Sequence, residues 1–166
     1  MNVDDILDRC CDLETRSGAL YRSFAAASRD QADLFALWTS MAREEDDHAR
    51  ILNDTRRRLP TIDAWTMQVS ARWDKVVHEV ERKLSEAERL AGDAGADQQL
   101  KAALELEMTE IEPLRQMLVA VAKRRPLRPI AEYHALRLAD AAERLSAEPG
   151  VRQLTARLRD RASHRT

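Results

Sequence analysis

The sequence predicts an all-α protein whose centre is a four-helix bundle. Glycine and proline are scarce, with four and five copies among 166 residues, and this composition favours helix throughout. Apolar residues recur every three to four positions in six segments separated by turn signals. The apolar series that begins at Ile6 is repeated from Trp73 onward, which indicates two related helical hairpins. Two hairpins joined by a long link make a four-helix bundle with one long crossover.

The first hairpin is predicted to contain helices over residues 3–28 and 31–57. Asn2 is a suitable N-cap, and the acidic Asp4 and Asp5 suit the positive end of the first helix. The turn between the helices, Ser28-Arg29-Asp30, supplies a cap for the second helix. The buried face of the first helix is expected to consist of Ile6, Cys10, Leu13, Ser17, Leu20, Phe24 and Ala27.

A long connection is predicted over residues 53–72. It contains Pro60 and has weaker helical periodicity, so we expect at most a short helix near residues 65–69. A connection of this length can cross the bundle from one end to the other. The second hairpin can therefore lie alongside the first.

The second hairpin is predicted over residues 71–91 and 98–123. Its turn contains Gly92, a typical residue just beyond a helix C-terminus, and Asp97, a typical N-cap. The buried face of its first helix is expected to consist of Trp73, Val77, Val80, Leu84, Ala87 and Ala91.

Two further helices are predicted over residues 130–147 and 151–161, separated by Pro149-Gly150. We therefore predict two parts, a four-helix bundle over residues 1–124 and a C-terminal helical extension over residues 125–166. The apolar residues of the fifth helix are Tyr133, Leu136, Leu138, Ala141 and Leu145.

Composition and charge exclude several classes of protein. The formal net charge of −2 gives no signal for binding nucleic acid, even though the last helix is basic. The two cysteines, Cys10 and Cys11, are neighbours that cannot easily form a disulfide with each other, which indicates a reducing compartment. The sequence shows no signal peptide and no apolar run that could span a membrane. We therefore expect a cytoplasmic protein.

Two ionisable residues lie where the second helix should have its apolar face. That face is set by Leu34, Trp38, Met41 and Leu52. Glu45 and His48 occupy the two missing steps of this series and share one side of the helix. Burying a carboxylate without a partner is very costly. A metal ion, an ion pair or a hydrogen-bond network must therefore compensate for this pair.

Further carboxylates are predicted to lie at matching heights in the two hairpins. Glu14 precedes the first turn by about as many residues as Glu45 follows it, so an antiparallel hairpin brings them level. The same argument makes Glu81 level with Glu107 across the second turn. We therefore expect carboxylates from four helices to meet in the bundle.

These residues resemble a known family. Glu14 together with Glu45-Asp46-Asp47-His48 is similar to the first half-site of rubrerythrin and other ferritin-like di-iron carboxylate proteins. The resemblance covers about residues 1–122 and is most specific over residues 10–52. It implies that each hairpin contributes one Glu and one Glu-x-x-His, with carboxylates bridging two irons and one histidine on each iron. It also implies redox chemistry with oxygen or peroxide, or iron handling.

The second hairpin departs from this pattern. Aligned by its apolar face, it has Ile111 and Leu114 at the positions of the motif. Aligned by charge, it has Glu107 and Glu110, so that a carboxylate replaces the second histidine. A third alignment places Pro113 there and fits the apolar face less well. No alignment restores a second Glu-x-x-His, and no rubredoxin-like module with four cysteines follows.

The sequence therefore predicts a ferritin-like metal site whose second position lacks its histidine. Carboxylates and imidazole suit iron, with manganese and zinc as alternatives, in one or two copies. The resemblance implies a non-haem iron oxidoreductase acting on oxygen or peroxide, such as a rubrerythrin-like peroxidase, or a protein that handles iron. The expected metal ligands are Glu14, Glu45, His48, Glu81, Glu107 and Glu110.

A metal-free interpretation uses the same residues. The Glu-x-x-His motif and nearby arginines would then form a buried network without any cofactor, and the protein would be a dimerising or partner-binding helical module. The resemblance also implies a homodimer. Tyr21 could hydrogen-bond a ligand carboxylate, whereas His78 and His134 are expected to be solvated because they lie on polar or mixed faces.

Overall fold

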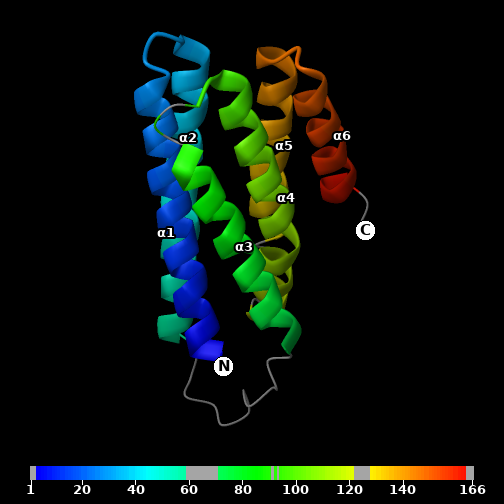
Figure 1. Cartoon of the computed structure of the whole chain (residues 1–166). Coiled ribbons are helices and arrows are strands. Elements are labelled where there is room, and N and C mark those ends of the chain that lie inside the picture. The colour runs from blue at the N-terminus through cyan, green and yellow to red at the C-terminus, as the bar shows by residue number, and fades with distance from the viewer. Residues whose placement is uncertain (1–2, 59–70, 91, 93, 122–127, 164–166) are drawn as a thin grey trace.

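The computed structural model describes residues 3–58, 71–90, 92, 94–121 and 128–163, and all regular structure in them is helical (Figure 1). The all-α prediction is therefore confirmed. Each helix begins and ends within two residues of its predicted bounds. The predicted short helix near residues 65–69 lies outside the described residues. The helices are α1 Val3–Ala27, α2 Ala32–Arg58, α3 Ala71–Leu90, α4 Ala96–Val121, α5 Arg128–Leu145 and α6 Pro149–Ser163.

The helices form a bundle that includes α5 as well as the two hairpins. α1 packs against α2 and α3, and α3 packs against α4, as two hairpins lying side by side require (Figure 1). α5 contacts both α2 and α4, while α6 packs against α4 and α5. One apolar core includes side chains from all six helices, so it continues across the predicted division at residue 124. That division remains a prediction.

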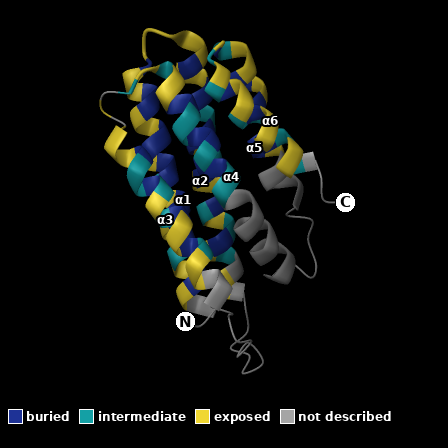
Figure 2. Cartoon of the chain, turned by 45° about the vertical axis from the view of Figure 1, so that its right-hand side comes forward, coloured by how far each residue is buried: buried dark blue, intermediate teal, exposed yellow. Residues whose placement is uncertain are grey.

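The predicted buried faces are largely confirmed. Figure 2 shows the buried residues on the inner sides of the helices. Ala27 is an exception, because it is exposed at the end of α1 while the next residue, Ser28, is buried. The confirmed core positions of α1 and α3 are Ile6, Cys10, Leu13, Ser17, Leu20, Phe24, Val77, Val80, Leu84 and Ala87.

Three helices, α4, α5 and α6, begin two residues earlier than predicted, and capping residues account for two of them. In α4 the backbone N–H of Gly95 donates to the side-chain oxygen of Gln98 at 3.1 Å, half of a capping box, and Asp97 therefore lies inside the first turn. In α6 a carboxylate oxygen of Glu148 accepts the N–H of Val151 at 2.7 Å. Pro149 then occupies the first turn, where its missing N–H is not needed. None of the helices in the described part is both long and apolar enough to cross a membrane.

Candidate metal centre

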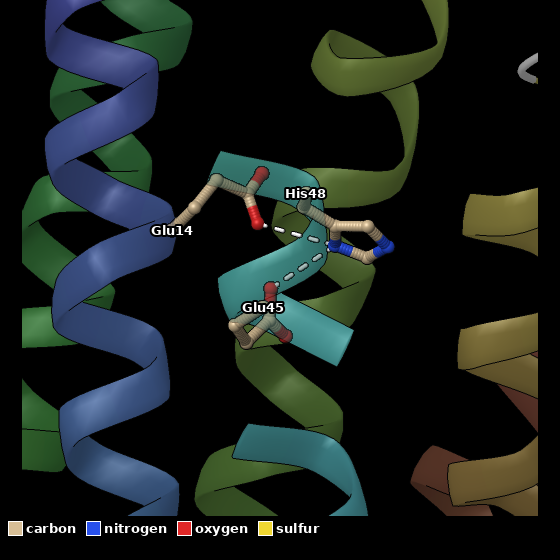
Figure 3. A group of neighbouring side chains, drawn as sticks. All are labelled: Glu14, Glu45 and His48. Carbon is tan, nitrogen blue, oxygen red and sulfur yellow. Dashed lines mark hydrogen bonds and ion pairs between the residues drawn. The ribbon is translucent and has the colours of Figure 1, made fainter. Parts of the chain in front are cut away.

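Glu14, Glu45 and His48 meet in the interior between α1 and α2. The Nδ1 atom of His48 lies 3.2 Å from Oε2 of Glu14 and 3.1 Å from Oε2 of Glu45 (Figure 3). All three side chains are buried. Glu45 and His48 share a helix face because they are three residues apart, and Glu14 reaches them from the level predicted by the hairpin turn.

A glycine beside this group lets the two helices approach each other. Gly18 lies one turn after Glu14, and a Cβ atom placed on it would lie 3.4 Å from the Cβ of Glu45 and 3.2 Å from Oδ1 of Asp46. The first distance is ordinary contact and the second is tight. The small residue therefore allows α2 to bring Glu45 close to α1.

A second group shares Glu45 with the first. The Nε2 atom of His134 on α5 lies 3.0 Å from Oε1 of Glu45 and 2.9 Å from Oε1 of Glu107 on α4. The hydroxyl of Tyr21 also donates to Oε1 of Glu107, at 2.9 Å. Glu45 thus presents one carboxylate oxygen to His48 and the other to His134, whose ring centroids are 5.2 Å apart.

The expectation that His134 is solvated was wrong, since only 2% of it is exposed. Its neighbour Tyr133 was predicted to lie on the apolar face of the fifth helix, but Tyr133 is 63% exposed and Arg137 lies over its ring. The buried face of α5 instead includes His134, Leu138 and Ala141, with spacings of four and three. That series in the sequence was the available signal for His134.

Glu44 holds the other nitrogen of the His134 ring. Oε2 of Glu44 lies 2.6 Å from Nδ1 of His134. Glu44 also forms an ion pair with Arg137, whose Nη2 donates to the hydroxyl of Ser40 at 2.7 Å. Sequence reasoning missed Glu44 because it appeared only as one more charge in an acidic stretch.

The structure does not bring Glu81 to either group. Glu81 is partly exposed on α3 and accepts hydrogen bonds from Nη2 and Nε of Arg9 at 2.8 and 3.0 Å. In the same hairpin, Lys83 on α3 and Glu105 on α4 form an ion pair at 2.7 Å. Apolar side chains occupy the inner face of α3. The side chain of Glu81 instead lies toward α1, where it pairs with Arg9. Glu110 lies among residues whose side chains are outside the description.

The two groups form a buried network of opposite charges. Burial lowers the pKa of His48, but hydrogen bonds to Glu14 and Glu45 outweigh this effect and raise it to about 10. Burial together with the charge of Glu45 raises the pKa of Glu14 to about 8. Burial would also raise the pKa of Glu45, yet its contacts with His134 and His48 hold it well below the usual value. Burial opposes the charge of His134, but Glu107 and Glu45 raise its pKa well above the usual value.

The ligand atoms of both groups are arranged so that they could hold a metal ion. Nδ1 of His48 and Nε2 of His134 each carry at most one proton, yet each faces two carboxylate oxygens. Separations of about 3 Å suit ligand atoms that share one ion as well as they suit hydrogen bonds. Nε2 of His48, the ring nitrogen that does not face Glu14 and Glu45, is buried without a hydrogen-bond partner among the described residues and does not itself support a metal at Nδ1. Each group offers three ligand atoms within 4.8 Å of one another.

Comparison with protein families agrees with this geometry. The family model described as Rubrerythrin matches residues 5–135 of the chain. The matched segment therefore includes the ligand candidates of both groups and ends just after His134. Comparison with curated proteins and with solved structures found no match. The match spans most of the chain, and the chain belongs to the rubrerythrin family.

Proposed function

We propose that the protein binds iron through Glu14, Glu45 and His48 and uses it in redox reactions with oxygen or peroxide. The observation that carries this proposal is the convergence of Nδ1 of His48 with carboxylate oxygens from two helices in the interior. A bound iron ion would supply one-electron chemistry that no side chain of this group can provide. The chain itself holds the ion, balances its charge with carboxylates and excludes bulk water from it.

The chemistry of the ligands supports a hard or borderline metal. Oxygen and imidazole ligands suit iron, manganese and zinc, whereas copper(I) prefers thiolate or thioether ligands. Neither group contains a sulfur ligand, and Sγ of Cys11 instead contacts the backbone oxygen of Ala49. Iron is preferred among these metals because the family resemblance implies it.

A metal-free role is the competing proposal, and one observation favours it. The two raised histidine pKa values mean that two imidazolium groups can neutralise the buried carboxylates without any ion. The protein would then be a helical module that dimerises or binds a partner. Metal titration separates these two proposals.

Anaerobic titration of the untagged, chelator-treated protein with ferrous iron is expected to show saturable binding. Replacing a ligand should weaken binding by more than the roughly 10–100-fold that the loss of an outer partner costs, so His48→Ala and Glu14→Gln should both fail to bind iron at the first position. His78→Ala is the matched control, because His78 is exposed on α3. Binding of neither iron, manganese nor zinc would leave the metal-free role as the better account.

Oxidation of the iron-loaded protein tests the redox part of the proposal. Mixing it with hydrogen peroxide or oxygen in a stopped-flow instrument should oxidise the bound iron faster than free ferrous iron in the same buffer. The reason is that the carboxylates stabilise the higher charge of ferric iron. A rate no faster than that of free iron would restrict the function to iron binding.

We also propose that the protein is a cytoplasmic homodimer. The family resemblance supports dimerisation, and neither Cys10 nor Cys11 forms a disulfide within the described residues, which is compatible with a reducing compartment. Light scattering of the purified protein at several concentrations measures the oligomeric state.

A further inference from the structure

We infer that a cleft between α2, α5 and α6 binds a short peptide in its zwitterionic form, with the ammonium group near Asp33 and the carboxylate near Arg144. The cleft has a volume of about 690 Å³, which is within the range of small-molecule sites. The residues that line it are separate from those of the two buried groups. The inference therefore does not depend on metal binding.

Small side chains leave space in the cleft, and apolar side chains form its floor. Ala36 on α2 and Ala141 on α5 both line it, at positions where longer side chains would fill the space. Leu37 and Ala141 are buried, and Leu145 is half-buried beside them. Such a floor can take apolar side chains of a peptide out of water, which favours binding.

Charged side chains of both signs line the cleft in equal numbers, three arginines and three carboxylates, so that their formal charges sum to zero. Two of the arginines are already paired. Arg159 forms ion pairs with Asp140 and Glu143, each at 2.6 Å, and Arg137 forms one with Glu44. A ligand without net charge leaves this balance intact, whereas an ion of either sign would disturb it.

The other two charges lie on opposite walls of the cleft. Asp33 is in the first turn of α2, and Arg144 is in the last turn of α5. Within the described part of the chain, neither forms an ion pair with the other or with a third residue. A ligand with an ammonium group at one end and a carboxylate at the other can pair with both of them at once.

The position of the two charges favours a peptide over a single amino acid. The ammonium and carboxylate groups of a free α-amino acid are attached to the same carbon atom. Each further residue separates the two ends of a peptide by up to about 3.5 Å, which suits charges on opposite walls. The apolar residues of the floor share helix faces with these charges, because Ala36 follows Asp33 by three residues and Ala141 precedes Arg144 by three.

Titration of the whole chain with the dipeptide leucyl-leucine, followed in proton–nitrogen correlation spectra, tests this inference. We expect saturable binding with a dissociation constant below about 10 mM. The backbone signals of the first two turns of α2 and the last two turns of α5 should shift. N-acetyl-leucyl-leucine lacks the ammonium group and leucyl-leucine amide lacks the carboxylate. Each should bind about 5-fold more weakly, which is the effect of losing one exposed ion pair.

Matched variants assign the two ends of the peptide. Arg144→Gln should bind leucyl-leucine and its amide equally well, and Asp33→Asn should bind leucyl-leucine and its N-acetyl form equally well. Arg152→Gln is the control and should keep both preferences, because Arg152 is exposed on α6 and does not line the cleft. Ala36→Trp should fill the cleft and abolish binding. Ala36 is exposed, so circular dichroism should show intact helices in this variant.

Three results would overturn the inference. They are no saturation of the wild type below about 10 mM, equal or tighter binding of the two blocked peptides, and undiminished binding to Ala36→Trp. The titration uses no added metal, so none of these results bears on the proposed binding of iron.

Discussion

Glu45→Ala is expected to destabilise the metal-free protein by about 3–5 kcal/mol and to remove all metal-dependent stabilisation. Glu45 is 1% exposed and lies between His48 and His134, so its removal breaks two buried ion pairs at once. A cluster made only of carboxylates would become more stable on losing one of them, because the repulsion between like charges would fall. This cluster also contains two imidazoles, so the loss of attraction outweighs the relief of repulsion.

Urea denaturation with and without metal measures both parts of this expectation. In chelator, the unfolding free energy of Glu45→Ala should be lower than that of the wild type. Metal at about 1,000 times its dissociation constant should stabilise the wild type by about 4 kcal/mol for one bound ion and leave Glu45→Ala unchanged.

Glu81→Ala is the matched control for this carboxylate. Glu81 is partly exposed and paired with Arg9 away from both groups, and such surface pairs contribute about 0–1 kcal/mol. Its metal response should equal that of the wild type. If Glu45→Ala were as stable in chelator as Glu81→Ala, the paired network around Glu45 would be incorrect.

The first half of the centre could be predicted because two sequence signals agree there. A short turn fixes the relative heights of Glu14 and Glu45, and the gap in the apolar series of α2 fixes the face of Glu45 and His48. For Glu81 the sequence predicted only the height in the hairpin, and not the direction of the side chain. Glu81 directly follows the buried Val80. Its side chain is therefore rotated about 100° from the buried face and lies toward α1.

The second half could not be predicted because it depends on packing between distant segments. The placement of α5 against α2 and α4 is tertiary, and no short turn fixes the height of His134 relative to Glu45. The face of α5 was also ambiguous, since Tyr133 and His134 are adjacent and the more apolar residue was assigned to the core. Burial of the polar residue is favoured here because Glu44, Glu45 and Glu107 all contact its ring.

Metal binding and protonation should compete at the same atoms, which gives the protein opposite pH dependences with and without metal. The pKa of His48 rises from an ordinary value of 6.5 to about 10 on folding, so its contribution to stability is complete below pH 6.5 and is lost as the pH rises through 10. The pKa of Glu14 rises from 4.5 to about 8, so keeping it buried costs more as the pH rises between these values. Both groups make the metal-free protein less stable at high pH.

At acid pH, Glu45 reverses the direction of this pH dependence, because it makes the metal-free protein less stable as the pH falls. Its pKa is held well below 4.5, so its contribution is present above that value and is lost as the pH falls through its folded pKa. The metal-free protein should therefore be most stable near pH 5. Between pH 6 and 9 its unfolding free energy, measured with urea in chelator, should fall by on the order of 3 kcal/mol for each of these two groups, His48 and Glu14. The fall should be smaller in His48→Ala, which lacks one of the groups responsible for it.

Iron and zinc must displace the protons of His48 and Glu14 to reach the first position, so metal affinity should rise over the same pH range in which the metal-free protein loses stability. Calorimetric titration with zinc in two buffers of different ionisation enthalpy measures the number of protons released. Release should be greatest near pH 6–7, where both groups are protonated, and smaller at pH 9, above the pKa of Glu14. Binding that releases no protons at pH 6.5 would place the ion elsewhere. At that pH His48 and Glu14 hold protons in hydrogen bonds, and a metal ion at the first position must replace them.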